Sequence, residues 1–317
     1  MAKRKREGSS GDAHPPDAKS VRSTTPSSSS TEIPALTVQI ITGSYERILH
    51  GFTAAIPSSS NGTKRTIHPQ PSAVQFVDTF LFEAHASAIR CLALSPMSRN
   101  DSSSKVTLAT GGTDERINLY SLSASPTVVN EKYPAIPMLT GNRVLENPRN
   151  REIGSLLHHS ATITALYFPS HAKLLAAAGD NTISVTRTRD WSVVSTITTP
   201  RPKTPGRPSG DTAAPGEAPS GINDFAVHPS MKLMLAVGRG ERCMRLWNLV
   251  TGKKAGVLSF SKDLLQSVNE SKWSSGEGRR IVWNPRGDGF AVAFEWGVLV
   301  FGVVSQFAFF FFFFFCG

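Results

Sequence analysis

The sequence predicts an all-β protein assembled from repeated β-modules, chiefly because one short pattern occurs three times. In each copy an apolar strand is followed by a turn with glycine and an acidic residue, and then by a second short strand. The copies span residues 108–120, 175–186 and 235–247, and a matched apolar stretch precedes each of them at residues 88–94, 162–168 and 221–227. Such modules cannot bury their own apolar faces, so they must stack on one another.

The repeated pattern resembles the WD repeat of β-propellers, in which His, Ser or Thr, Asp and Trp form a hydrogen-bonded set within each blade. The resemblance assigns this blade-bracing role to His85, Thr110, Asp114, Tyr120, His159, Asp180 and Trp247. The second copy has alanines at the hydroxyl position and Thr186 at the Trp position. The third copy has Glu241 in place of Asp and Ala218 in place of His. The repeats are therefore degenerate, but three aligned copies favour a propeller.

Long inserts separate the copies. A blade usually runs about 40–45 residues, whereas 66 residues separate Asp114 from Asp180 and 61 separate Asp180 from Glu241. The inserts at residues 123–150 and 199–220 are rich in Pro, Gly and Ser or Thr, and a third polar segment spans residues 58–72. These compositions predict exposed loops between blades, and disorder is favoured over a functional role for each.

Residues 1–36 differ from the rest of the chain. They are rich in Ser, Thr and Pro and nearly free of large apolar residues, which predicts a disordered tail. The tail opens with the basic cluster Lys3, Arg4, Lys5 and Arg6. This cluster favours nuclear import, while nucleic-acid contact and a merely solvated charged tail remain the alternatives. The net charge of +10 also biases the chain toward polyanions such as RNA.

The cysteines and the N-terminus bear on the cellular compartment. The three cysteines have no metal-like spacing and form no even framework, which favours a reducing, intracellular compartment. No N-terminal segment has the apolar core of a secretory signal.

The C-terminal end predicts the opening of a further blade and then an unusual tail. Residues 280–301 read as two or three strands, and seven consecutive phenylalanines follow at positions 309–315. We expect residues 304–317 to be an aberrant tail of a truncated or mis-spliced product. The alternative is a membrane anchor, because residues 298–316 are long and apolar enough for a spanning helix. The absence of a basic or aromatic interface anchor weighs against it.

Catalytic motifs are missing from the sequence. No glycine-rich segment has the lysine of a phosphate-binding loop, the pair at residues 158–159 lacks zinc-ligand spacing, and no Gly-x-Ser-x-Gly elbow occurs. His85 and Asp114 could act as a base and its orienting acid, but buried polar groups must be paired, so bracing is favoured. The prediction is a non-enzyme without catalytic, cofactor or metal residues.

A narrower resemblance covers residues 37–301. Residues 38–52 resemble the opening blade of the PAK-interacting protein family, whose fungal branch is the maintenance-of-killer WD-repeat factor. Segments at residues 83–89, 111–117, 157–166, 228–238, 245–253 and 282–287 fit the same family in order. The resemblance implies an incomplete propeller at residues 37–303, with about five of seven blades. The degenerate middle blade, the inserts and the absence of closing blades and of a basic C-terminal tail depart from the family.

The family resemblance implies a function for the chain. It implies a non-catalytic nucleolar scaffold in large ribosomal subunit biogenesis and rRNA processing, with pre-ribosomal proteins and pre-rRNA as partners. The alternative is a signalling scaffold that binds and negatively regulates a PAK-type kinase. A membrane protein anchored by the C-terminal run is the third and weakest reading.

Overall fold

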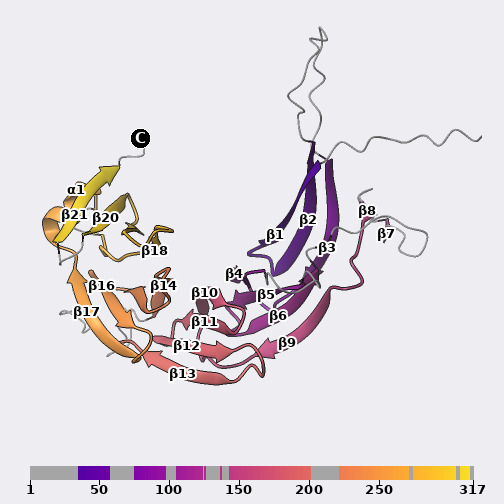
Figure 1. The fold of residues 1–317 in the computed structure, drawn as a ribbon, viewed down its shortest axis with the longest axis horizontal. Helices are drawn as coiled ribbons and strands as arrows, with labels where there is room; N and C mark the ends of the chain where they lie inside the picture. Colours follow the sequence, from indigo (N-terminus) through magenta and orange to yellow (C-terminus); the bar gives the residue numbers. More distant parts are fainter. Residues whose placement is uncertain are drawn as a thin grey trace, which may run out of the picture. The chain divides into compact units, whose positions relative to one another are not determined.

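The computed structural model describes residues 35–57, 75–97, 105–123, 125, 136–137, 143–200, 221–270, 274–304 and 308–314. The strands in these residues form five sheets that follow one another in chain order (Figure 1). The predicted all-β fold is confirmed, and the open sheets fit an incomplete propeller. The basic cluster at residues 3–6 and the predicted loop at residues 58–72 lie outside the described residues. The predicted loop at residues 199–220 also lies outside them, except for residues 199–200.

Each sheet is built mainly from strands that are neighbours in the sequence and antiparallel. Sheet 1 contains β1 (Ala35–Gly43), β2 (Ile48–Pro57), β3 (Gln75–Glu83), β8 (Arg143–Val144) and β7 (Ile136–Pro137). Sheet 2 contains β4 (Ile89–Leu94), β5 (Lys105–Gly112), β6 (Ile117–Ser123) and β9 (Arg151–Leu156). Sheet 3 contains β10 (Ile163–Ser170), β11 (Lys173–Ala178), β12 (Thr182–Arg187) and β13 (Val193–Thr198).

The last two sheets follow the same order. Sheet 4 contains β14 (Ile222–Val227), β15 (Leu233–Gly238), β16 (Cys243–Asn248) and β17 (Lys253–Ser259). Sheet 5 contains β18 (Arg280–Trp283), β19 (Gly289–Ala293), β20 (Val298–Val304) and β21 (Ala308–Phe314). The helix α1 (Lys262–Ser267) connects sheets 4 and 5, and the Ser261 hydroxyl caps its first turn by accepting from the Leu264 N–H.

The apolar core consists of four clusters, one between each pair of successive sheets. Strand β11 shows why. Because side chains alternate along a strand, Leu174, Ala176 and Ala178 pack toward sheet 2, whereas Leu175 and Ala177 pack toward sheet 4. Both faces of β11 are buried, and its residues 174–178 are all apolar. The strand therefore needs a neighbouring sheet on each side. This explains why the repeats stack.

The first strands of sheets 2 to 5 meet one another. Strand β4 contacts β10, β10 contacts β14, and β14 contacts β18. Each of these strands is therefore brought close to the next, although their first residues are 74, 59 and 58 positions apart in the sequence. This arrangement positions the cavity discussed below.

Two segments have more order than the sequence indicated. Within the insert at residues 123–150, Val144 pairs with Asp78 of β3 and is buried, so part of that insert returns to sheet 1. Residues 308–314, within the phenylalanine-rich tail, form β21 against β20. Among the described residues no helix is long and apolar enough to cross a membrane.

Candidate functional site: polar sets and cavities

The first polar set joins three predicted residues of sheet 2. His85 precedes β4, Thr110 lies on β5, and Asp114 lies in the turn before β6. The His85 Nε2 is 2.7 Å from the Thr110 Oγ1, and the Nδ1 is 3.0 Å from the Asp114 Oδ1. Because a carboxylate only accepts, Nδ1 donates to Asp114. The Asp114 Oδ2 also accepts from the Ala86 N–H at 3.1 Å, which holds the entry to β4 in place.

Tyr120, the fourth predicted member, lies on β6 and packs edge-on against Phe82 with ring centroids 5.5 Å apart. Burial, with a smaller effect of the Glu152 carboxylate, raises the pKa of the Tyr120 hydroxyl to about 12. Asn118, two residues earlier, extends the polar set, since its Nδ2 donates to the Ala84 carbonyl at 2.5 Å. Sequence reasoning did not single out Asn118.

The second polar set brings together the predicted His159 and Asp180 and two hydroxyl residues that sequence reasoning missed. The His159 Nδ1 is 3.1 Å from the Asp180 Oδ2, and the Nε2 is 2.8 Å from the Ser184 Oγ. Ser184 lies on β12 opposite Ala176, so the neighbouring strand supplies the hydroxyl that β11 lacks. Burial alone would raise the pKa of Asp180, but hydrogen bonds from His159 and Thr182 lower that pKa to about 2.

The third polar set is an ion pair. Glu241 is buried and accepts two hydrogen bonds from the guanidinium of Arg245, which lies on β16 opposite Ala236. Trp247 is also buried, and its indole N–H has no hydrogen-bond partner among the described residues. Ala236 lies at the register position where sheet 2 has Thr110, so this position offers no hydroxyl group. Ala218, the substitute for His in this copy, lies outside the described residues.

These sets are poorly placed for catalysis. The side chains of His85 and His159 are 0% and 1% exposed, so neither imidazole reaches a substrate in solvent. Cys91 is a nucleophile type in sheet 2, but burial raises the pKa of its thiol to about 12, so the thiol stays protonated. No group of three His, Cys, Asp or Glu residues in the described part of the chain could hold a metal ion.

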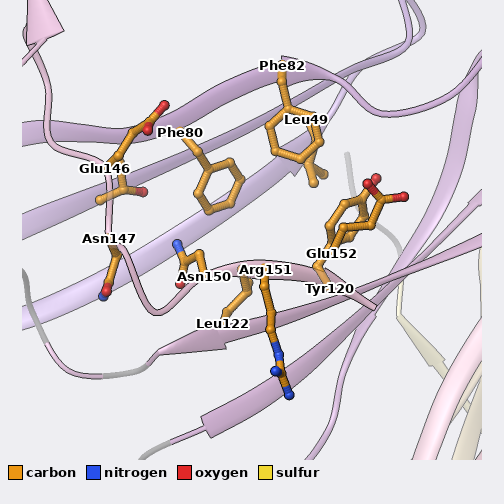
Figure 2. A pocket seen from close by; sticks show the side chains of 11 residues that line it. Leu49, Phe80, Phe82, Tyr120, Leu122, Glu146, Asn147, Asn150, Arg151 and Glu152 are labelled. Atoms are coloured by element: carbon orange, nitrogen blue, oxygen red, sulfur yellow. The ribbon is translucent and has the colours of Figure 1, made fainter. Parts of the chain in front are cut away.

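A cavity of about 270 Å³ lies between sheets 1 and 2 (Figure 2). Phe80, Phe82 and Tyr120 form an aromatic wall, while Asn147 and Asn150 come from the segment before β9. A volume near 300 Å³ is the lower end for small-molecule sites. Nothing in its lining resembles a set of catalytic groups.

Comparison with known proteins agrees with this geometry. The family model for the WD domain, G-beta repeat, matches residues 75–121 and 150–186. The "p21-activated protein kinase-interacting protein 1-like" of Danio rerio is 27% identical over 255 residues, 80% of this chain and 48% of its own length. The Gallus gallus protein of the same name is 29% identical over 245 residues, 77% and 47% of the two chains.

A fungal relative matches as well. "Protein MAK11" of Saccharomyces cerevisiae is 27% identical over 289 residues, 86% of this chain and 53% of its own length. The chain thus spans about half the length of the curated relatives that it matches.

Five stacked antiparallel sheets with His–Asp sets at repeated positions define a WD-repeat protein, a class typical of protein-binding scaffolds. Within that class, the chain is similar over most of its length to the PAK-interacting protein 1 and MAK11 relatives.

Proposed function

We propose that the chain is a non-catalytic scaffold in the maturation of the large ribosomal subunit, acting in the nucleolus. The observation that carries this proposal is the match to Protein MAK11 over 86% of the chain, since the maintenance-of-killer branch is the one associated with ribosome assembly. The net charge of +10 suits an RNA-rich particle, because cationic side chains release counterions when they approach phosphates. The basic residues Lys3, Arg4, Lys5 and Arg6 would supply nuclear import.

A scaffold role also suits the sealed polar sets. Residues that are buried and fully paired stabilise the sheets and leave the loops and rims to bind partners. The proposed partners are pre-ribosomal proteins, with pre-rRNA as a further contact. The proposal includes no enzymatic step, no cofactor and no membrane insertion.

The test is localisation and sedimentation of the tagged full chain. We expect nucleolar fluorescence, and co-sedimentation with precursors of the large subunit on a sucrose gradient. Replacement of the four basic residues at positions 3–6 by Gln should move the protein to the cytoplasm. A cytoplasmic wild-type protein whose depletion leaves precursor rRNA unchanged would remove the proposal.

A second candidate function is binding and negative regulation of a PAK-type kinase. The names of the Danio rerio and Gallus gallus relatives favour this function. So does the name of "Shk1 kinase-binding protein 15" of Schizosaccharomyces pombe, which is 24% identical over 74% of this chain. It predicts capture of the kinase in a pull-down that survives RNase treatment and does not depend on residues 3–6. Loss of the kinase after RNase treatment would favour the ribosomal proposal.

A further inference from the structure

Three of the five sheets have a β-bulge at the same place. The pairing between the first two strands shifts register after Ile89 in sheet 2, after Ile163 in sheet 3 and after Ile222 in sheet 4. The extra residues at these bulges are Arg90, Thr164 and Asn223. A bulge leaves its extra residue outside the ladder and redirects its side chain. The repeat therefore gives each of these three sheets one residue whose side chain lies outside the ladder. Arg90 is exposed, and Thr164 and Asn223 are partly buried.

Sheet 5 repeats this geometry with two arginines. The Arg279 N–H donates to the Ala293 carbonyl, and Arg280 is the register partner of the same Ala293, so two residues oppose one. Because the first strands contact one another in chain order, these positions converge. One cavity of about 410 Å³ is lined by Arg90, Thr164, Asn223, Arg239, Arg279 and Arg280. A second cavity of about 350 Å³ shares Ile89, Arg90 and Arg280 with it.

The four arginines that line this cavity, Arg90, Arg239, Arg279 and Arg280, are called the arginine cluster below. The side chains of Arg90 and Arg239 make no hydrogen bond or ion pair with any residue that the structure describes. Arg280 has a long pairing of 3.8 Å to Asp224 and a side chain that is 62% exposed. Arg279 pairs with Glu295 at the surface. Most guanidinium donors of the cluster therefore face solvent.

The carboxylates beside the cluster do not neutralise it. Glu277 lines the cavity but accepts the Gly240 N–H. Asp224 accepts the Ile281 N–H at 3.0 Å and lies mostly buried beneath the cavity. Together with Glu295, which pairs with Arg279, three carboxylates stand against four guanidinium groups. The arginine cluster therefore keeps a net positive charge in a concave site, which raises the local concentration of anions.

The shape and the lining of the site indicate which anion it takes. A guanidinium presents a planar fork of donors that matches a carboxylate or a phosphate with two hydrogen bonds. Single-stranded RNA is usually held by aromatic side chains on which bases stack, and none of the described residues lining the two cavities is aromatic. The polar amide of Asn223 already donates to the Gly278 carbonyl, which fixes the rim. The lining thus favours a peptide over RNA.

We propose that the arginine cluster, which gathers where the first strands of sheets 2 to 5 meet, is the docking site for an oxyanion-bearing segment of a protein partner, rich in Asp and Glu or phosphorylated. This proposal rests on the proposed scaffold function and adds to it the site and the chemistry of one partner. Because four sheets contribute to the cavity, recognition depends on the stacked assembly and not on any single repeat.

The test uses the full chain and fluorescence anisotropy at physiological ionic strength. The probes are a short labelled Glu-rich peptide, the same peptide with phosphoserine in place of Glu, a Gln version, and a single-stranded RNA of equal charge. The variant combines Arg90→Gln with Arg239→Gln, because neither arginine side chain makes a hydrogen bond or an ion pair with a residue that the structure describes. The control is Arg47→Gln with Arg187→Gln, which removes the same charge from side chains that are 50% and 52% exposed in surface ion pairs.

We expect the wild-type chain to bind the Glu peptide or the phosphopeptide and to bind the Gln peptide at least about tenfold more weakly, a difference of about 1.4 kcal/mol. The cluster variant should lose about tenfold or more, whereas the control should change little. Whichever of the two acidic peptides binds with higher affinity identifies carboxylate or phosphate as the preferred ligand group. Each of three results would overturn the proposal. The first is equal affinity for the Glu and Gln peptides, and the second is an equal loss of affinity in the cluster variant and the control. The third is tighter binding of RNA than of both acidic peptides, with RNA affinity reduced in the cluster variant. Failure here with intact co-sedimentation would leave the scaffold function standing.

Discussion

Removal of the Asp114 carboxylate tests whether the polar sets brace the sheets. In Asp114→Ala, the His85 Nδ1–H loses its acceptor at 3.0 Å, and the Ala86 N–H loses its acceptor at 3.1 Å. The His85 side chain is 0% exposed, so water cannot replace the carboxylate there. An unsatisfied buried donor costs about 1–3 kcal/mol. Ala86 is exposed, so its N–H can bond to water at little cost.

The expected loss in the free energy of unfolding is therefore about 1–3 kcal/mol. Asp114→Asn keeps one acceptor oxygen for the imidazole, so it should lose about half as much. The matched control is Asp190→Ala. Asp190 also bonds within a turn, to the Ser192 hydroxyl at 2.8 Å, but its side chain is 49% exposed. Solvent compensates there, and the expected loss is small.

The assay is urea unfolding of the full chain followed by far-UV circular dichroism, with midpoints converted through the common slope. The order Asp114→Ala, Asp114→Asn, Asp190→Ala should run from most to least destabilised. If Asp114→Ala loses no more than Asp190→Ala, the buried set does not brace the sheet and the reasoning fails. A changed slope for Asp114→Ala would indicate that sheet 2 unfolds separately. A second spectroscopic probe tests this, because separate unfolding gives transitions that do not coincide.

Three further outcomes can be measured in the same way. Ser184→Ala removes the partner at 2.8 Å from the His159 Nε2 and should cost about 1–3 kcal/mol, and an unchanged midpoint would contradict it. Because the pKa of Asp180 lies at about 2, below its ordinary 3.8, this carboxylate contributes stability above about pH 4 that is lost as the pH falls toward about 2. The stability gap between wild type and Asp180→Asn should shrink over that interval, and a constant gap would refute it. Ala236→Ser should give the buried Trp247 indole N–H an acceptor and raise stability by about 0.5–1 kcal/mol, and a loss would count against it.

The sequence predicted the sheets well because the same apolar alternation recurs, and the predicted His–Asp contacts follow from matched positions in the repeats. It missed Ser184 and Arg245 because the second and third copies take their polar partner from the neighbouring strand. A signal was present: the third strands of sheets 2, 3 and 4 carry Asn118, Ser184 and Arg245 at one register position, opposite Thr110, Ala176 and Ala236. A polar residue at the same register position in three successive sheets indicates that each has a buried polar partner.

The arginine cluster could not be predicted from the sequence alone. A bulge changes the register by one residue, and that shift decides which face a side chain takes. In a regular strand, Arg90 would read only as an outward polar residue between Ile89 and Cys91. The convergence also depends on contacts between first strands that lie far apart in the sequence. Spacing along the chain gives no hint that Arg90 and Arg280 line one cavity.

The two kinds of repeated position therefore serve different ends. At the bracing positions each sheet carries a polar group that must be paired, and where His or Ser/Thr is absent, Arg245 with Glu241 provides another pairing. At the bulge positions the sheets carry Arg, Thr, Asn and Arg in turn. The side chain of Arg90, the first of them, has no hydrogen-bond or ion-pair partner in the part of the chain that the structure describes. Residues that a repeat constrains sustain the fold, whereas residues that it leaves free can be selected for a partner.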